Sequence, residues 1–243
     1  MTAAAPRIGC LDLDTFFVSV ERLFDPSLEG KAVVVGALPG NRGVVTACSY
    51  EARAFGVHSG MPIATAYELA PHAVFLPTRH GVYTPYAKQV RELVDKVCPR
   101  VQVASIDELF CDFSGCERLY RRPCDATDDQ AIERTVRELT ATIAAETGLP
   151  SSVGIATSLP LSKIASGLAK PAGVLLIPAG QEAAVLAPLP VRKYPGIGPV
   201  GERTCHVGHC MIVDNRGVMH AQIPGTPVLE HQQDRMTHAK IAF

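Results

Sequence analysis

Three features are scarce in this sequence of 243 residues: an excess of charge of one sign, long apolar runs, and closely spaced cysteines. The formal net charge is −1, so any binding to nucleic acid would have to come from local basic patches. No apolar run is long enough to cross a bilayer, and the N-terminus lacks the basic-then-apolar order of a secretory signal. We therefore expect a cytoplasmic protein that does not enter a membrane.

The eight cysteines have no CxxC spacing. In a reducing compartment, most of them should be free thiols that behave as small hydrophobic side chains. Apolar residues make up 47% of the chain and charged residues 19%, which is typical of a globular protein with a sizeable core. The length leaves room for more than one domain.

Two adjacent carboxylates, Asp107 and Glu108, interrupt an apolar run over residues 101–113 that otherwise predicts a strand. Neighbouring side chains of a straight strand point to opposite faces, so both acids can serve one site only if the chain turns there into a hairpin. Two like charges held together raise each other's pKa unless a cation lies between them. On these residues alone, a solvated turn that carries acids is the simpler interpretation.

A second acidic pair, Asp12 and Asp14, ends the first predicted strand, residues 7–12. Asp14 is expected to be the N-cap of a helix over residues 15–24, whose apolar residues recur at helical spacing. Asp12 has no such structural role. It lies at the C-terminal end of a strand next to a helix N-terminus, where α/β proteins place their chemistry.

A short helix is expected after Ser49, a suitable N-cap, with Gly56 as its C′ residue. Tyr50 and Arg53 are three residues apart and therefore share one face of this helix. A guanidinium beside a phenol hydroxyl suits phosphate oxygens. From these residues alone, an exposed pair on a solvated helix is the better interpretation.

The predicted elements follow the order β-α-(insertion)-α-β-β-α-β, which is an α+β fold of the ferredoxin-like, split βαβ type with an insertion after the first helix. Further helices are predicted over residues 62–70, 83–97, 129–147 and 161–168. Further strands are predicted over residues 31–36, 44–47, 74–76, 152–156 and 174–177.

In this topology the first strand and the hairpin are neighbours in one antiparallel sheet, so Asp12, Asp107 and Glu108 should meet at one edge. Three carboxylates around an opening suit Mg²⁺, which completes its shell with water and substrate phosphates. Two such ions about 3.5–4 Å apart would clamp the attacking and leaving oxygens of an in-line phosphoryl transfer. The topology is also that of the palm of many nucleotidyl-transfer enzymes.

These residues resemble those of Y-family, DinB-type translesion DNA polymerases, the DNA polymerase IV group. Five motifs occur in the family's order between residues 7 and 204. They are similar to its first metal motif, fingers motif, second metal motif, late palm motif and the helix-hairpin-helix turn of its thumb. The matching residues are 10–21 (CLDLDTFFVSVE), 49–57 (SYEARAFGV) with 60–62 (GMP), 105–108 (SIDE), 162–166 (SKIAS) with 170–173 (KPAG), and 195–198 (PGIG).

The resemblance implies roles for residues of the two metal motifs. Asp12, Asp107 and Glu108 would be the catalytic residues and would hold two Mg²⁺ ions, with the Leu13 carbonyl as a further ligand. Phe17 would be the steric gate that packs under the sugar, so that a ribose 2′-OH clashes. The attacking group would be a primer 3′-OH whose pKa is lowered by one of the ions.

The resemblance also implies binding roles and partners. Tyr50, Arg53 and Lys163 would contact the triphosphate of the incoming nucleotide. Gly196 and Gly198 would bind a DNA phosphate through the backbone of the thumb turn. The expected partners are primer-template DNA and a dNTP, and a monomer is expected. A sliding clamp is a partner of the family, but no clamp-binding tail is visible here.

The implied division places the palm in residues 7–14 and 81–173 and the fingers in residues 15–80. The end of the palm and a partial helical thumb would follow in residues 174–204. Residues 205–243 lose the family pattern, and we expect the basic little-finger domain of the family to be absent. We expect a truncated or frameshifted product with a disordered or loosely packed tail.

Two smaller departures concern the nucleotide pocket. The family often has a hydroxyl at the position of Ala47, for which Thr46 or Ser49 are candidate substitutes. The loop of residues 157–160 lacks a basic residue that is common in the family.

A metal site in the tail is a further alternative, although its spacings match no recognised zinc module. Its ligands would be Cys205, His206, His209 and Cys210.

Two functions stay open at this point. One is a weak, distributive translesion polymerase, indicated by the three acids. The other is a catalytically silent remnant that binds nucleotide or a partner, favoured by the near-neutral charge and the missing basic domain. A nucleotidyl cyclase shares the palm topology, but the 195–198 turn would have no role in one.

Overall fold

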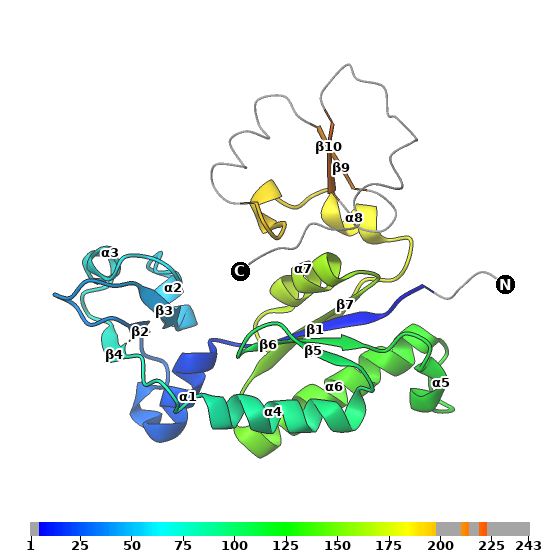
Figure 1. The fold of residues 1–243 in the computed structure, drawn as a ribbon, viewed down its shortest axis with the longest axis horizontal. Coiled ribbons are helices and arrows are strands. Elements are labelled where there is room, and N and C mark those ends of the chain that lie inside the picture. Colours follow the sequence, from blue (N-terminus) through cyan, green and yellow to red (C-terminus); the bar gives the residue numbers. More distant parts are fainter. Residues whose placement is uncertain (1–4, 198–209, 214–218, 223–243) are drawn as a thin grey trace.

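The main sheet of the computed structural model confirms the predicted ferredoxin-like order. The structure describes residues 5–197, 210–213 and 219–222. The strands of the main sheet are β1 (Ile8–Leu13), β5 (Val101–Val103), β6 (Glu108–Asp112), β7 (Ser151–Ala156) and β8 (Val174–Leu176). They lie in the order β5-β6-β1-β7-β8 (Figure 1), with β1 antiparallel to both neighbours and β8 parallel to β7. The first four strands form the split βαβ unit, and β8 extends it.

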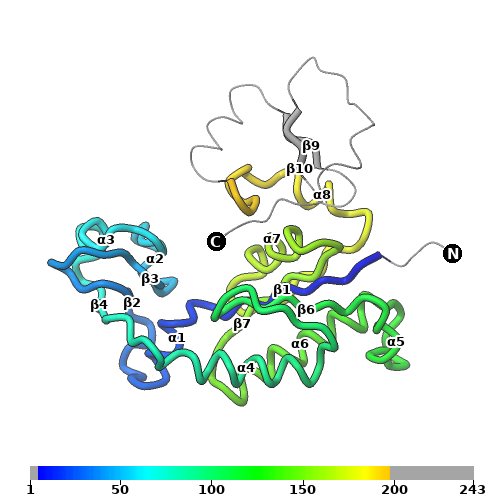
Figure 2. The backbone as a smooth tube through the Cα atoms, viewed as in Figure 1, coloured from blue at the N-terminus to red at the C-terminus, as the bar shows by residue number. Residues whose placement is uncertain are grey.

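Helices cover both faces of this sheet. On one face lie α4 (Thr84–Val97) and α6 (Asp128–Thr147), and on the other lies α7 (Leu159–Ala169), as Figures 1 and 2 show. The side of α4 and α6 holds the largest cluster of buried apolar side chains, which includes Phe113 and Ile143. The opposite face of the sheet is covered by α7 and carries the site described below.

A smaller sheet lies beside the main one, at the left of Figure 1. It consists of β2 (Val33–Gly36), β3 (Val45–Cys48) and β4 (Val74–Pro77) in the order β3-β2-β4, and it has an apolar core of its own. Two helices, α2 (Tyr50–Arg53) and α3 (Ile63–Leu69), belong to it. This part is inserted between the first helix and α4, as the sequence predicts.

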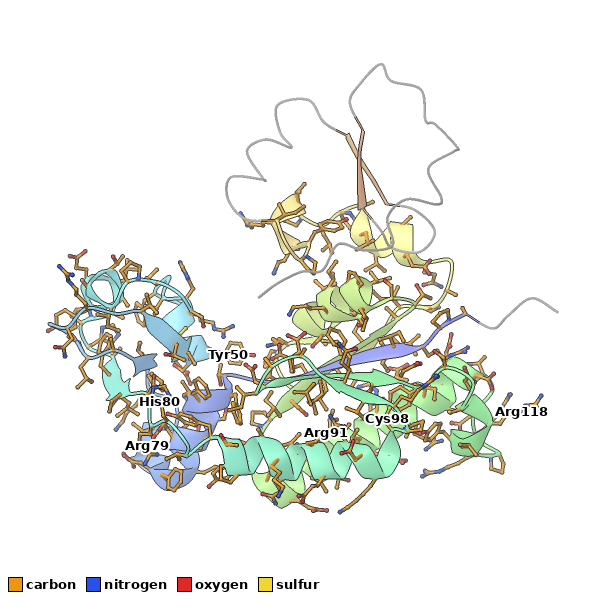
Figure 3. All side chains as sticks on the ribbon, in the orientation of Figure 1. Tyr50, Arg79, His80, Arg91, Cys98 and Arg118 are labelled. Carbon is orange, nitrogen blue, oxygen red and sulfur yellow. The ribbon has the colours of Figure 1, made fainter. Side chains whose placement is uncertain are left out.

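The first helix, α1 (Phe16–Phe24), joins the two parts. Phe16 packs into the core of the main sheet, whereas Val18 packs against the smaller sheet. Glu21 of the same helix is buried and accepts a hydrogen bond from Nε of Arg79 at 2.9 Å. Arg79 lies where the chain returns from the smaller sheet to α4 (Figure 3), so the pair ties both ends of the insertion together.

The start of α1 corrects one prediction, because Asp14 is not its N-cap. Thr15 holds that position in the left-handed conformation, with φ of 45°, and makes no side-chain capping bond. The Asp14 carboxylate instead accepts hydrogen bonds from three donors in other parts of the chain. A buried carboxylate with three donors is better satisfied than a cap exposed to water, so tertiary contacts override the local preference.

The remaining elements are short. They are η1 (Pro26–Leu28), α5 (Glu117–Tyr120), α8 (Glu182–Leu186), η2 (Val191–Lys193), β9 (Cys210–Val213) and β10 (Met219–Gln222). The strands β9 and β10 pair antiparallel. Apart from them, the tail of residues 205–243 lies outside the described residues. Of the metal ligands suggested there, Cys205, His206 and His209 also lie outside them, and Cys210 begins β9. Within the described ranges, no helix is long and apolar enough to cross a membrane.

Helix α7 lies directly against the sheet at Gly154 of β7. A Cβ atom at Gly154 would lie 2.0 Å from the backbone nitrogen of Ser166 and 2.2 Å from the carbonyl oxygen of Ser162. Only glycine therefore permits this approach of helix backbone to strand backbone.

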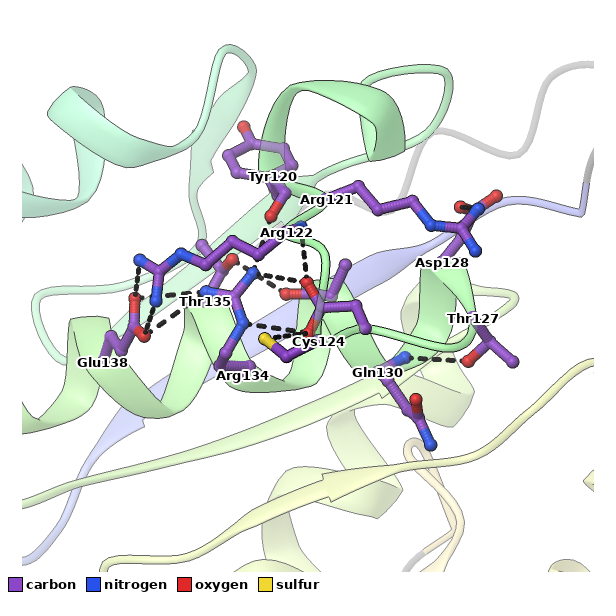
Figure 4. A network of polar contacts seen from close by, with 12 residues as sticks. Tyr120, Arg121, Arg122, Cys124, Thr127, Asp128, Gln130, Arg134, Thr135 and Glu138 are labelled. Atoms are coloured by element: carbon purple, nitrogen blue, oxygen red, sulfur yellow. Dashed lines mark hydrogen bonds and ion pairs between the residues drawn. The ribbon is translucent and has the colours of Figure 1, made fainter.

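The Arg122–Glu138 and Arg134–Asp125 pairs fix the loop that precedes α6 (Figure 4). Arg134 donates to both oxygens of Asp125, at 3.0 and 2.8 Å, and Arg122 donates to both oxygens of Glu138, at 2.7 and 2.9 Å. The Arg134 guanidinium, with help from the Arg122 backbone N–H, lowers the pKa of Asp125 to about 2.

Replacing the glycine under α7 should destabilise the protein. Gly154→Ala is expected to lower the free energy of unfolding by about 1–3 kcal/mol, because the added methyl must push the helix off the strand. Urea unfolding followed by far-UV circular dichroism measures the change. Gly167→Ala is the matched control, because Gly167 lies in α7 and a methyl group added to it would meet nothing within 4 Å. This substitution should not lower the free energy of unfolding. Equal effects of the two substitutions would contradict the packing argument.

The ion pair between Asp125 and Arg134 should affect how the free energy of unfolding changes at acidic pH. The pKa of Asp125 is about 2 in the folded protein and about 3.9 in an unfolded chain. Its contribution is therefore complete above about pH 4 and is lost as the pH falls toward 2. Asp125→Asn should lower the free energy of unfolding at pH 7, and its difference from the wild type should shrink between pH 4 and 2. Urea unfolding at a series of pH values tests this, and a constant difference would refute it.

Candidate functional site

The three predicted acids lie at one edge of the main sheet. Asp12 of β1 and Glu108 of β6 are directly opposite in the antiparallel register. Side chains in such a pair project from the same face, with Cβ atoms about 4.5–5.5 Å apart. Asp107 lies in the β5–β6 turn, and its carbonyl oxygen accepts a hydrogen bond from the Leu13 N–H at 2.9 Å. The predicted hairpin is confirmed.

Two lysines pair with these acids. Nζ of Lys163, on α7, lies 2.6 Å from Oε2 of Glu108, and Lys170, just after α7, pairs with Asp12. Burial raises the pKa of the Asp12 carboxyl, and Lys170 opposes that shift. The charges of Asp107 and Glu108 raise the Asp12 pKa further, which shows that the three acids share one electrostatic environment.

The donor atoms of this edge fit Mg²⁺, although they are not arranged as a finished site. Among the residues that the structure describes, no three His, Cys, Asp or Glu side chains are grouped closely enough to hold a metal ion. Each acid has a partner of its own. Lys170 pairs with Asp12, Lys163 pairs with Glu108, and the Ser105 hydroxyl donates to Asp107. Carboxylate and carbonyl oxygens are nevertheless the ligands that Mg²⁺ prefers.

Asp14 is a site residue that the sequence did not reveal. Its Oδ1 accepts a hydrogen bond from the Tyr50 hydroxyl at 3.1 Å, and Nζ of Lys170 lies 3.7 Å from the same oxygen. Its Oδ2 accepts from Oγ of Ser152 and from the Ala172 N–H, both at 2.7 Å. Three of these four groups come from residues 150 and beyond, so no local sequence signal could have identified them.

The predicted nucleotide contacts lie around the same corner. Tyr50 lies on the side of the smaller sheet that faces the main sheet (Figure 3), and the Arg53 guanidinium is 5.2 Å from its ring centroid. The half-buried ring of Phe17 lies against Tyr83, with centroids 4.2 Å apart. Ser49 caps α2 as predicted, and its buried hydroxyl is used there, so it cannot supply the pocket hydroxyl considered above.

A basic groove extends from this corner toward the predicted thumb turn. It has a volume of about 350 Å³ and lies between α7 and the turn that contains Gly196, whose φ is 86°. Lys163, Arg192 and Lys193 are among its lining residues, which suits phosphate groups. Gly198 lies outside the described residues.

Known proteins resemble this chain over most of the described part. A model described as the impB/mucB/samB family matches residues 11–167. DNA polymerase IV of Streptomyces coelicolor is 48% identical over 195 residues, which are 80% of this chain and 39% of that protein. DNA polymerase IV of Methanoculleus marisnigri is 42% identical over 201 residues, which are 82% of this chain and 53% of that protein.

Two solved structures share the fold. The crystal structure of DinB from Sulfolobus solfataricus has a TM-score of 0.73 and 31% identity, covering 83% of this chain and 57% of that one. An insertion ternary complex of Dbh DNA polymerase has a TM-score of 0.73 and 29% identity, with the same coverage. The chain therefore spans 39–57% of the length of these relatives. Because the family model covers more than half of the chain, this chain belongs to the impB/mucB/samB family, the Y-family.

Proposed function

We propose that this chain is a template-directed DNA polymerase of the error-prone translesion type, which adds a dNMP to a primer 3′-OH. The observation that supports this most is the meeting of Asp12, Asp107 and Glu108 at one sheet edge, with the phenol of Tyr50 and the ammonium of Lys163 beside them. Acids that can hold metal ions, next to groups that can bind phosphate, are what a nucleotidyl transfer needs.

In this proposal Asp12, Asp107 and Glu108 hold two Mg²⁺ ions, with the Leu13 carbonyl as a further ligand. Bound Mg²⁺ supplies neutralisation of the charge that develops during phosphoryl transfer. The ammonium of Lys163 is then free to leave Glu108 for a phosphate oxygen. Its side chain is half exposed, so the movement requires no rearrangement of the core.

Tyr50 and Arg53 would complete the triphosphate site from the smaller sheet, as donors to its oxygens. Phe17 would lie under the sugar, and its contact with the ring of Tyr83 would keep it rigid enough to exclude a 2′-hydroxyl. The corresponding division has a palm of residues 7–14 and 81–173 and fingers of residues 15–80.

Primer-template DNA would follow the basic groove beside α7, with Gly196 and Gly198 at the thumb turn. Affinity for DNA without sequence preference comes mostly from phosphate contacts. A net charge of −1 leaves those contacts to local groups such as Lys193, so we expect weak and distributive extension. The same low charge favours the second candidate, a catalytically silent protein that binds a nucleotide.

Loss of either hairpin acid should abolish activity. In primer extension with Mg²⁺ at low salt, Asp107→Ala and Glu108→Ala should each reduce the rate more than about a hundredfold, because even residues that only support metal ligands contribute 10- to 100-fold. Glu92→Gln is the control, since this exposed acid on α4 makes only a surface pair with Lys88 and should leave extension unchanged.

The two candidate functions give different results in the same experiment. Unchanged extension by the Asp107→Ala protein would refute the proposed catalytic site. Binding of Mg²⁺·dNTP by the wild type without any extension would select the silent nucleotide-binding protein instead.

A further inference from the structure

Asp14 joins the two parts of the molecule at the proposed nucleotide site. Its side chain is fully buried, and one oxygen is fixed from the main sheet by Ser152 and by the backbone N–H of Ala172. The other oxygen accepts from the hydroxyl of Tyr50, which belongs to the smaller sheet. Nζ of Lys170 lies 3.7 Å from that same oxygen. Among the contacts of this carboxylate within the described part of the chain, the Tyr50 bond is the one that crosses between the two sheets.

The Tyr50 hydroxyl has a single proton to donate. Burial raises the pKa of Tyr50, and the negative charge of Asp14 raises it further, so the phenol stays protonated at neutral pH. In the structure this proton is directed at Asp14. Triphosphate oxygens bound to metal at neutral pH are acceptors, so Tyr50 cannot donate to Asp14 and to a triphosphate at once.

We propose that Asp14 is a positioning residue that holds Tyr50 against the main sheet in the nucleotide-free protein and competes with the incoming triphosphate for the Tyr50 hydroxyl proton. Binding of the nucleotide replaces one acceptor of that proton by another. The bond to Asp14 that is lost reduces the affinity for the nucleotide, as any equilibrium with a non-binding state does. This inference rests on the proposed function, in which Tyr50 contacts the triphosphate.

Asp14→Asn keeps the carboxylate oxygen that faces the main sheet and replaces the one that faces Tyr50. The amide oxygen can still accept from Ser152 and Ala172, while the amide nitrogen faces Tyr50 and donates to the phenol oxygen. The phenol proton is then available to a phosphate. We expect Mg²⁺·dATP to bind about three- to tenfold more tightly, measured by isothermal titration calorimetry, because a hydrogen bond to a charged group no longer has to be broken.

Removal of a negative charge could strengthen binding of any anion, so the same substitution is also made in the Tyr50→Phe background. There it should leave the affinity for Mg²⁺·dATP unchanged within twofold, because no hydroxyl proton is left to compete for. An equal gain in both backgrounds, or weaker binding by Asp14→Asn in the wild-type background, would overturn the competition.

A second measurement needs no nucleotide. In urea unfolding, the effects of Asp14→Asn and Tyr50→Phe should be non-additive by about threefold or more in the equilibrium constant. The reason is that Asp14→Asn replaces a charge-assisted bond by a neutral one only where the Tyr50 hydroxyl is present. Glu92→Gln is the control: this acid lies on the surface of α4, where it pairs with Lys88, and its substitution should be additive with Tyr50→Phe. Additivity of Asp14→Asn with Tyr50→Phe would overturn the tie between them.

The two measurements distinguish failure of this inference from failure of the proposed function. If the wild type binds no Mg²⁺·dATP, the proposed function and the competition are both overturned, while the unfolding cycle decides whether Asp14 holds Tyr50. If the wild type binds the nucleotide and the cycle is additive, the function stands and the inference fails.

Discussion

The close contact between α7 and β7 is the constraint on which the site depends. Because Gly154 has no side chain, the helix backbone lies directly on the strand backbone. That contact brings Lys163 to Glu108, and the end of the helix brings Lys170 to Asp12 and the Ala172 N–H to Asp14. Without it the acids of β1 and β6 would still face one another, but their cationic and hydrogen-bonding partners would be missing.

The electrostatics of the corner follow from this arrangement. Burial raises the pKa of Asp12, and the charges of Asp107 and Glu108 raise it further. An unpaired cluster of three acids would therefore destabilise the folded protein. The ammonium groups of Lys163 and Lys170 offset that repulsion in the absence of other cations. Binding of metal and nucleotide would then be an exchange of partners. The two acids paired with lysines would bind the metal instead, and Lys163 would pair with a phosphate instead of with Glu108. Such an exchange keeps each charge compensated, which costs less than exposing any of them.

The features that were predicted correctly depend on contacts between residues close together in the sequence. The period-2 argument at Asp107 and Glu108 requires a turn, and the structure has one. The cap at Ser49 was equally predictable, because its partner is three residues away. Asp14 was assigned wrongly by the same rule, since its partners Ser152 and Ala172 lie 138 and 158 residues away and their donors outweigh a local cap. Lys170 was noted only as part of a motif, and its pairing with Asp12 depends on where α7 ends.

Two of the polar ties around the insertion, Glu21–Arg79 and Tyr50–Asp14, differ in strength. Glu21 and Arg79 form a charged pair with two hydrogen bonds, and Glu21 is buried. Such a pair is costly to break, because it would leave a buried carboxylate uncompensated. The bond from Tyr50 to Asp14 has one neutral donor, and Asp14 keeps two other donors when it is lost. Loss of the first tie is therefore expected to destabilise the insertion more than loss of the second, which in the proposed competition gives way to the nucleotide.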